Sequence, residues 1–83
     1  MDKLKALVVD DSVLYRKILS DILSSFPDIE LVGTAHNGKV AIEKMQRLEP
    51  DLITLDFEMP ELDGIETLKK LREASPRTRA IMV

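Results

Sequence analysis

The sequence predicts an α/β protein in which helices cover both faces of a doubly wound parallel sheet. Three observations support this fold class: short apolar runs alternate with amphipathic segments, the connections between them are short, and two of the apolar runs end in aspartate. Strands that alternate with helices pair in parallel through right-handed crossovers. With 83 residues the chain holds one domain at most.

The first half of the chain contains two predicted strands and one predicted helix. Leu4–Val9 is almost entirely apolar, as expected of a parallel strand that is covered on both faces. From Ser12 the apolar period becomes helical, and Pro27 ends the helix. The apolar stripe of this helix comprises Leu14, Ile18, Ile22 and Phe26 with Leu19 and Leu23 beside them, opposite Arg16, Lys17, Ser20 and Asp21. Ile29–Ala35 is a strand, and its Glu30 places it nearer a sheet edge.

The second half repeats the alternation. Asn37 is the predicted N-cap of a helix whose inner face is Ala41, Met45 and Leu48, and Pro50 lies just beyond its end. Leu52–Leu55 is a buried strand. Asp63 and Glu66 have capping-box spacing for a helix that runs through Ala74, and Ala80–Val83 begins a fourth strand.

The predicted alternation of elements both begins and ends on a strand. A doubly wound sheet that finishes on a bare apolar strand has an open edge and an uncovered face. We therefore expect residues 1–83 to be a single, C-terminally incomplete domain. We also expect the isolated chain to be molten, or to associate with another copy through the open edge.

Composition excludes several classes of protein. The chain has no cysteine, which rules out disulfides and thiolate zinc sites, and the lone His36 cannot form a histidine cluster. The net charge of −3 argues against a nucleic-acid or anionic-membrane surface. The N-terminal apolar run is too short for an export signal, so we expect a cytoplasmic protein that contacts neither nucleic acid nor membrane.

Three aspartates follow two of the predicted strands. Asp10 and Asp11 follow the first strand and Asp56 follows the third, and in a flavodoxin-like order of 2-1-3-4-5 these strands are neighbours. Three nearby carboxylates repel one another unless a cation lies among them, and Mg²⁺ suits such oxygen ligands. The alternative is structural: Asp10, Asp11 and Ser12 cap the following helix, and Asp56 opens a turn.

The runs VVDDS (Val8–Ser12) and LDFEMPELDG (Leu55–Gly64), with their spacing, resemble the receiver domain of two-component response regulators. The resemblance implies a (βα)₅ fold, of which this chain holds four strands and three helices. It implies that Asp56 accepts a phosphoryl group from a histidine kinase. It further implies that Asp11, Asp56 and the backbone carbonyl of Glu58 bind Mg²⁺, with Asp10 acting through metal-bound water. The family's switch Ser/Thr and its lysine fall beyond Val83.

Within this family, Pro27–Gly38 and Leu55–Gly64 most resemble the regulatory half of chemotaxis protein-glutamate methylesterases. These enzymes demethylate receptor glutamates and deamidate receptor glutamines with a separate C-terminal domain. The resemblance implies a chemotaxis histidine kinase as partner, chemoreceptors as targets of the parent protein, and an esterase activity that this piece itself lacks.

Other functions stay open as alternatives. The receiver of a stand-alone or DNA-binding regulator is the runner-up, and an aspartyl-phosphate phosphatase is more remote because that class uses D-x-D where this chain has Asp10-Asp11-Ser12. A nucleotide or flavin binder lacks the glycine-rich phosphate loop. Arg16 and Lys17 are either a kinase-docking surface or a solvated helix face.

Overall fold

A computed structural model describes residues 3–55 and 64–82 of the chain. The described residues form a four-stranded sheet in the order β2-β1-β3-β4, with every neighbouring pair parallel, and three helices. In chain order the elements are β1 (Leu4–Val9), α1 (Val13–Ser24), β2 (Ile29–Ala35), α2 (Gly38–Leu48), β3 (Leu52–Leu55), α3 (Gly64–Ala74) and β4 (Arg79–Met82). The predicted fold class and strand order are confirmed.

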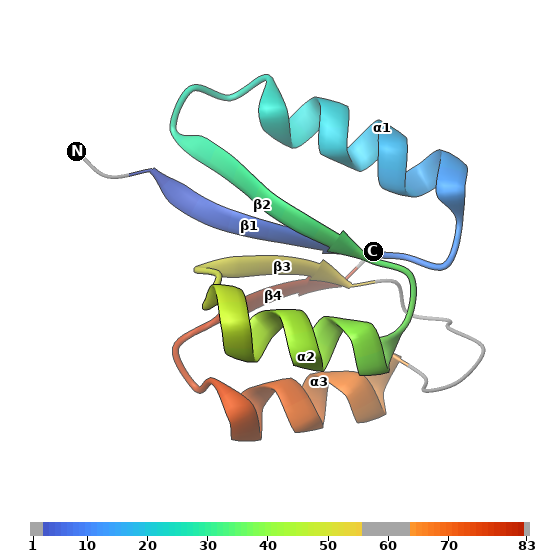
Figure 1. Cartoon of the computed structure of the whole chain (residues 1–83), viewed down its shortest axis with the longest axis vertical. Coiled ribbons are helices and arrows are strands. Elements are labelled where there is room, and N and C mark those ends of the chain that lie inside the picture. The colour runs from blue at the N-terminus through green and yellow to red at the C-terminus, as the bar shows by residue number, and fades with distance from the viewer. Residues whose placement is uncertain (1–2, 56–63, 83) are drawn as a thin grey trace.

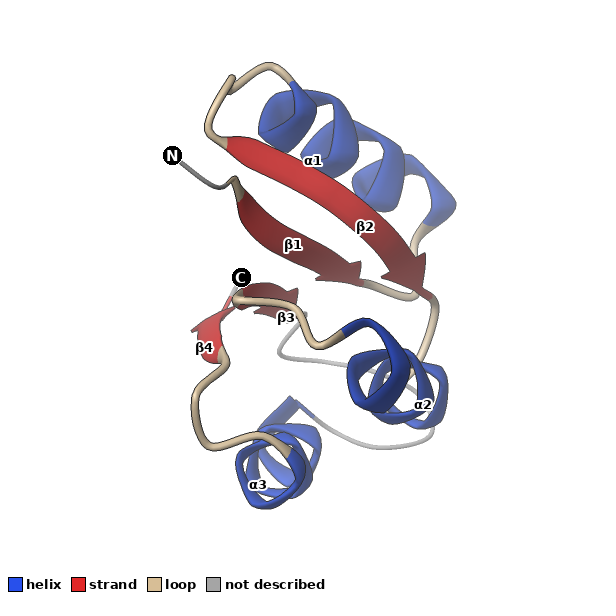
Figure 2. Ribbon diagram, turned by 60° about the vertical axis from the view of Figure 1, so that its left-hand side comes forward, coloured by secondary structure: helices blue, strands red, loops and turns tan. Residues whose placement is uncertain are grey.

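The helices lie in two layers around the sheet. Figure 1 shows α1 on one side of the sheet and α2 and α3 side by side on the other, and Figure 2 shows the same separation from another direction. α1 contacts β1 and β2, whereas α2 packs against α3 and against the same two strands from the opposite face. The sheet is therefore doubly wound, as the alternation of elements predicts.

The core lies between the sheet and the layer formed by α2 and α3. Its buried members are Leu7, Val9, Ala35, Ala41, Met45, Ile53, Leu55 and Leu71. The side chains of β1 and β3 are also buried on the other face, at Val8 and Thr54, so both strands are covered on both faces as expected. Gly33 lets α2 approach β2 closely, since a Cβ there would lie 3.3 Å from Leu48 Cδ1.

Helix α2 begins and packs as the sequence predicts. The Asn37 side chain accepts a hydrogen bond from the Val40 amide at 2.9 Å, which makes Asn37 the N-cap. Ala41 and Met45 are buried and Leu48 is half-buried. The helix ends at Leu48, and the φ of 48° at its C-cap, Glu49, is left-handed, a conformation that usually favours glycine.

The other predicted boundaries agree to within a residue, except at the end of α1: this helix ends at Ser24, so Phe26, which the sequence predicts on its apolar stripe, lies beyond it. α3 ends at Ala74, and β4 begins at Arg79, one residue before the predicted start. The proposed cap Asp63 and the predicted strand end Val83 lie outside the described residues. β2 is an edge strand with an exposed Glu30, as expected.

The orientation of α1 differs from the sequence prediction. Its half-buried side consists of Arg16, Leu19, Ser20 and Leu23, at helical spacings of three and four residues. Leu14 and Ile22, which the sequence predicts on the inner face, are 63% and 49% exposed, and no residue of α1 is fully buried. The apolar surface of this helix is wider than its contact with β1 and β2, so the sheet covers only one flank of it.

The α1 side of the sheet also exposes part of β4. Ala80 packs against the core on the α2 and α3 side, so Ile81 points to the opposite face, where it is 54% exposed. Together with Leu14, Ile18 and Ile22 of α1, Ile81 adds to the apolar surface exposed on this side. The expected self-association stays a prediction. No helix within the described ranges is both long and apolar enough to cross a membrane.

Candidate functional site

The register of the sheet brings together the strand ends that precede the predicted site. Val9, the last residue of β1, pairs with Ala35 of β2 and with Leu55 of β3. Asp10 and Asp11 follow Val9 directly, and Asp56 follows Leu55 in the sequence. Asp10 and Asp11 therefore lie at the carboxyl-terminal edge of the sheet, where β3 also ends. Asp56 and Glu58 lie outside the described residues, so their roles stay predictions.

Asp10 is held on three sides. It is 4% exposed, and its amide donates to the Ala35 carbonyl at 3.0 Å. Its carboxylate oxygen Oδ1 accepts a hydrogen bond from the Ser12 amide at 2.9 Å. Its backbone carbonyl accepts one from Nη1 of Arg16 at 2.7 Å. These bonds fix both the backbone and the side chain of Asp10 at the end of β1.

Asp11 differs from its neighbour, because its side chain is exposed to solvent. The helix cap that follows is Ser12, whose Oγ accepts a hydrogen bond from the Tyr15 amide at 3.3 Å. The structural alternative thus explains Ser12, and in part Asp10 through its bond to the Ser12 amide. It leaves Asp11 without a structural role among the described residues, which is consistent with a side chain that binds something from solution.

The donor chemistry at this edge suits a hard cation. Carboxylate oxygens are the ligands that Mg²⁺ prefers, and it keeps several waters when one or two carboxylates hold it. Within residues 3–55 and 64–82 no group of three or more His, Cys, Asp or Glu side chains could hold a metal. The predicted third carboxylate, Asp56, is outside those ranges. His36 is exposed.

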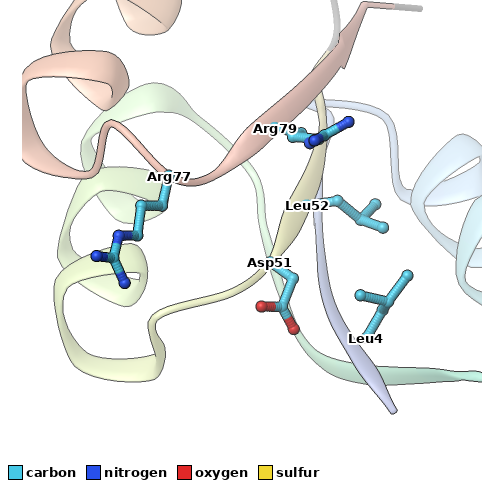
Figure 3. A pocket seen from close by; sticks show the side chains of 5 residues that line it. All are labelled: Leu4, Asp51, Leu52, Arg77 and Arg79. Atoms are coloured by element: carbon cyan, nitrogen blue, oxygen red, sulfur yellow. The ribbon is translucent and has the colours of Figure 1, made fainter. Parts of the chain in front are cut away.

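A cavity of about 360 Å³ lies elsewhere, beside the starts of the strands. It is lined by Leu4, Asp51, Leu52, Arg77 and Arg79. Figure 3 shows Arg77, in the turn before β4, and Arg79, the first residue of β4, pointing away from each other. Asp51 Oδ2 already accepts a hydrogen bond from the Lys5 amide at 2.7 Å, so the groups do not converge on one ligand. The cavity is separate from the acidic pair.

The comparisons with known proteins define the family. The model of the response regulator receiver domain matches residues 6–83, and the chain belongs to this family. It is 52% identical, over all 83 residues, to a protein-glutamate methylesterase/protein-glutamine glutaminase of Desulfotalea psychrophila, and covers 23% of that protein. A protein of the same name from Thermotoga maritima is 51% identical over 80 residues, 96% of this chain and 23% of its own. The chain thus spans about a quarter of the length of these relatives.

Solved structures agree with the sequence relatives. The response regulator domain of Thermotoga maritima CheB is 50% identical with a TM-score of 0.91, and the match covers 96% of this chain and 59% of that one. A CheX–CheY complex with BeF₃ and Mg²⁺ from Borrelia burgdorferi is 35% identical with a TM-score of 0.89, covering 98% and 61%. A TM-score near 0.9 for both kinds of protein shows that the fold alone does not separate subfamilies. The sequence identity does, and the chain is a receiver domain of the CheB type, as the resemblance predicts.

Sequence reasoning missed the part that Arg16 plays at this edge. It offered either a docking surface or a solvated face, whereas the structure places Arg16 half-buried with its guanidinium on the Asp10 carbonyl. The signal that could have indicated this role is the position of Arg16 in the sequence. Arg16 lies one helical turn after Ser12, on the flank that also carries Leu19 and Leu23.

Proposed function

We propose that the chain is the phosphoacceptor of a chemotaxis response regulator, and that Asp56 receives a phosphoryl group from a histidine kinase. The observation that carries the proposal is the pairing of Val9 with Leu55, which sets Asp10 and Asp11 beside the strand end that leads into Asp56. In this protein the phosphoryl group controls an attached methylesterase and glutamine deamidase domain. The curated relatives, which carry that activity in their names, support this assignment.

The transfer is a single in-line displacement. A carboxylate oxygen of Asp56 attacks the phosphorus of the phosphohistidine, an O–P bond forms, and the P–N bond breaks with its electron pair passing to the imidazole. A carboxylate nucleophile is ordinarily ionised at neutral pH, so the attack needs no general base. Such a reaction depends chiefly on alignment and on neutralisation of the phosphoryl charge.

The residues that follow β1 and β3 have different roles in binding the metal ion. Asp11, Asp56 and the backbone carbonyl of Glu58 would hold Mg²⁺, which supplies charge neutralisation when bound. The exposed carboxylate of Asp11 can reach a cation in solution. The buried Asp10, with one carboxylate oxygen already bonded to the Ser12 amide, would support the ion indirectly, through water. The proposal places the reaction in the cytoplasm, with a chemotaxis-type histidine kinase as donor and chemoreceptors as targets of the attached domain.

The test uses a small phosphodonor, acetyl phosphate, on the protein with its effector domain, with and without Mg²⁺. We expect one acid-labile phosphoryl group per chain, dependent on Mg²⁺ and mapped to Asp56 by mass spectrometry. Asp56→Asn removes the nucleophile and should abolish labelling, and Asp11→Ala should abolish it by removing a metal ligand. Asp21→Asn is the matched control, because it neutralises an exposed aspartate on α1 and should leave labelling unchanged.

Two results would overturn the assignment. Undiminished labelling of Asp56→Asn would show that another residue is the acceptor. A Mg²⁺ titration followed by NMR in which the amides of residues 10–12 do not shift would show that the metal binds elsewhere. The subfamily is tested in the protein with its effector domain, where phosphorylation should raise the rate of methyl-ester hydrolysis on methylated receptors.

A further inference from the structure

We propose that Arg16 is a positioning residue of the acidic site, which orients the peptide between Asp10 and Asp11 so that the Asp11 carboxylate is presented to a divalent cation. The inference rests on the proposed function of this edge. The central observation is the hydrogen bond from Nη1 of Arg16 to the Asp10 carbonyl, 2.7 Å long, partly buried and spanning six residues.

This bond acts on Asp11 through covalent geometry. The Asp10 carbonyl belongs to the planar peptide that ends at the Cα of Asp11, so fixing the carbonyl fixes the plane from which the Asp11 side chain departs. The preceding amide of Asp10 is already held by Ala35, at the end of β2. Arg16 therefore supplies the remaining backbone constraint between the end of β1 and Asp11.

The following turn is tied to the same helix. The Arg16 amide donates to the Ser12 carbonyl at 2.9 Å, and Ser12 caps α1 through the Tyr15 amide. The Ser12 amide in turn donates to the Asp10 carboxylate. Residues of α1 thus hold the segment from Asp10 to Ser12 at both of its ends, and Arg16 makes two of these hydrogen bonds.

The packing of α1 determines where the guanidinium lies. Arg16 is half-buried on the flank with Leu19 and Leu23, whereas its neighbour Lys17 is exposed. A guanidinium is planar, carries several donors and is weakly hydrated, so it serves a partly buried carbonyl better than an ammonium does. Lys17, which has the same charge and adjoins Arg16 in the sequence, is the matched control.

Arg16 can change the Mg²⁺ affinity in two opposite ways, through its charge and through its positioning of Asp11, and this makes the proposal testable. As a positive charge near the acidic pair, Arg16 would repel the cation, so its removal would tighten Mg²⁺ binding. As a positioning residue it preorganises Asp11, so its removal would weaken Mg²⁺ binding. Outer-shell groups that orient metal ligands typically contribute about tenfold or more to affinity.

The experiment measures Mg²⁺ affinity and amide hydrogen exchange for the wild type, Arg16→Met, Arg16→Lys and Lys17→Met. We expect Arg16→Met to weaken Mg²⁺ binding about tenfold and to speed exchange of the Ser12 amide in the metal-free protein. Arg16→Lys keeps the charge and should still show weakened binding, while Lys17→Met should leave binding unchanged or slightly tighter. The exchange of core amides such as those of Leu7 and Val9 reports whether each variant is folded.

The outcomes separate this proposal from the previous one. Equal Mg²⁺ affinity and equal Ser12 exchange in the wild type and Arg16→Met, or tighter binding in that variant, would overturn the positioning role alone. If the wild type bound no Mg²⁺ at residues 10–12, the proposed function would fail. The exchange of the Ser12 amide in the metal-free variants would then still decide whether Arg16 holds this turn.

Discussion

Thr54 of β3 carries a buried hydroxyl without a hydrogen-bond partner, and its replacement by valine should stabilise the protein. Its Oγ1 is the buried side-chain polar atom that finds no partner among the described residues, and the residue is 4% exposed. In register it lies between Val8 of β1 and Ile81 of β4, both apolar. Valine has nearly the same shape and places a methyl group where the hydroxyl stands.

The magnitude follows from the desolvation of the hydroxyl. Leaving a buried donor or acceptor unsatisfied costs about 1–3 kcal/mol, and threonine to valine removes this cost while keeping the packing. We expect a gain of about 1–2 kcal/mol in the free energy of unfolding. For a domain of this size each kcal/mol raises the melting temperature by roughly 4–8 °C.

The measurement is urea and thermal denaturation at one fixed protein concentration, so that association does not enter the comparison. Thr78→Val is the matched control, since the Thr78 hydroxyl pairs with Ser75 Oγ at 2.8 Å and donates to the Pro50 carbonyl at 2.8 Å. The same substitution should there destabilise the protein by about 1 kcal/mol or more. A loss of stability in Thr54→Val equal to that in Thr78→Val would refute the reasoning.

Three further predictions concern backbone conformation, core packing and self-association. Glu49→Gly should raise the free energy of unfolding by about 1 kcal/mol, because the residue has a φ of 48°; unchanged or lower stability in urea denaturation would contradict this. Met45→Ala should lower it by about 2–5 kcal/mol, because Met45 is fully buried in the core; a loss below 1 kcal/mol would show that the site collapses around the smaller side chain. The exposed Ile22 and Ile81 should promote concentration-dependent association, so Ile22→Lys with Ile81→Thr should lower the sedimentation coefficient at high concentration. A wild type that sediments as a monomer at every protein concentration tested would contradict the predicted association.

Local chemistry accounts for what the sequence alone predicted correctly. The apolar runs at β1 and β3, the Asn37 cap and the inner face of α2 each depend on residues within one or two turns of each other, so their pattern is readable without the fold. The order of strands also follows, because parallel connections through helices leave few topologies. With that order, Asp10 and Asp11 are placed beside the end of β3.

Other features needed the tertiary structure. The sequence marks a broad apolar surface on α1, but only the contact with β1 and β2 decides that Leu19 and Leu23 face inward while Leu14 is exposed. The contrast between buried Asp10 and exposed Asp11 depends on the neighbouring β2, whose Ala35 carbonyl holds the Asp10 amide.

Arg16 shows the same distinction between what the sequence determines and what the tertiary structure decides. The sequence by itself determined that this chain is a receiver domain with acids at the end of its first strand, because those motifs are contiguous. The role of the arginine depends on the rotation of α1 about its axis, which turns the guanidinium toward the Asp10 carbonyl rather than toward solvent. Periodicity records which residues share a helix face, but which flank meets the sheet is decided by packing between elements distant in the chain.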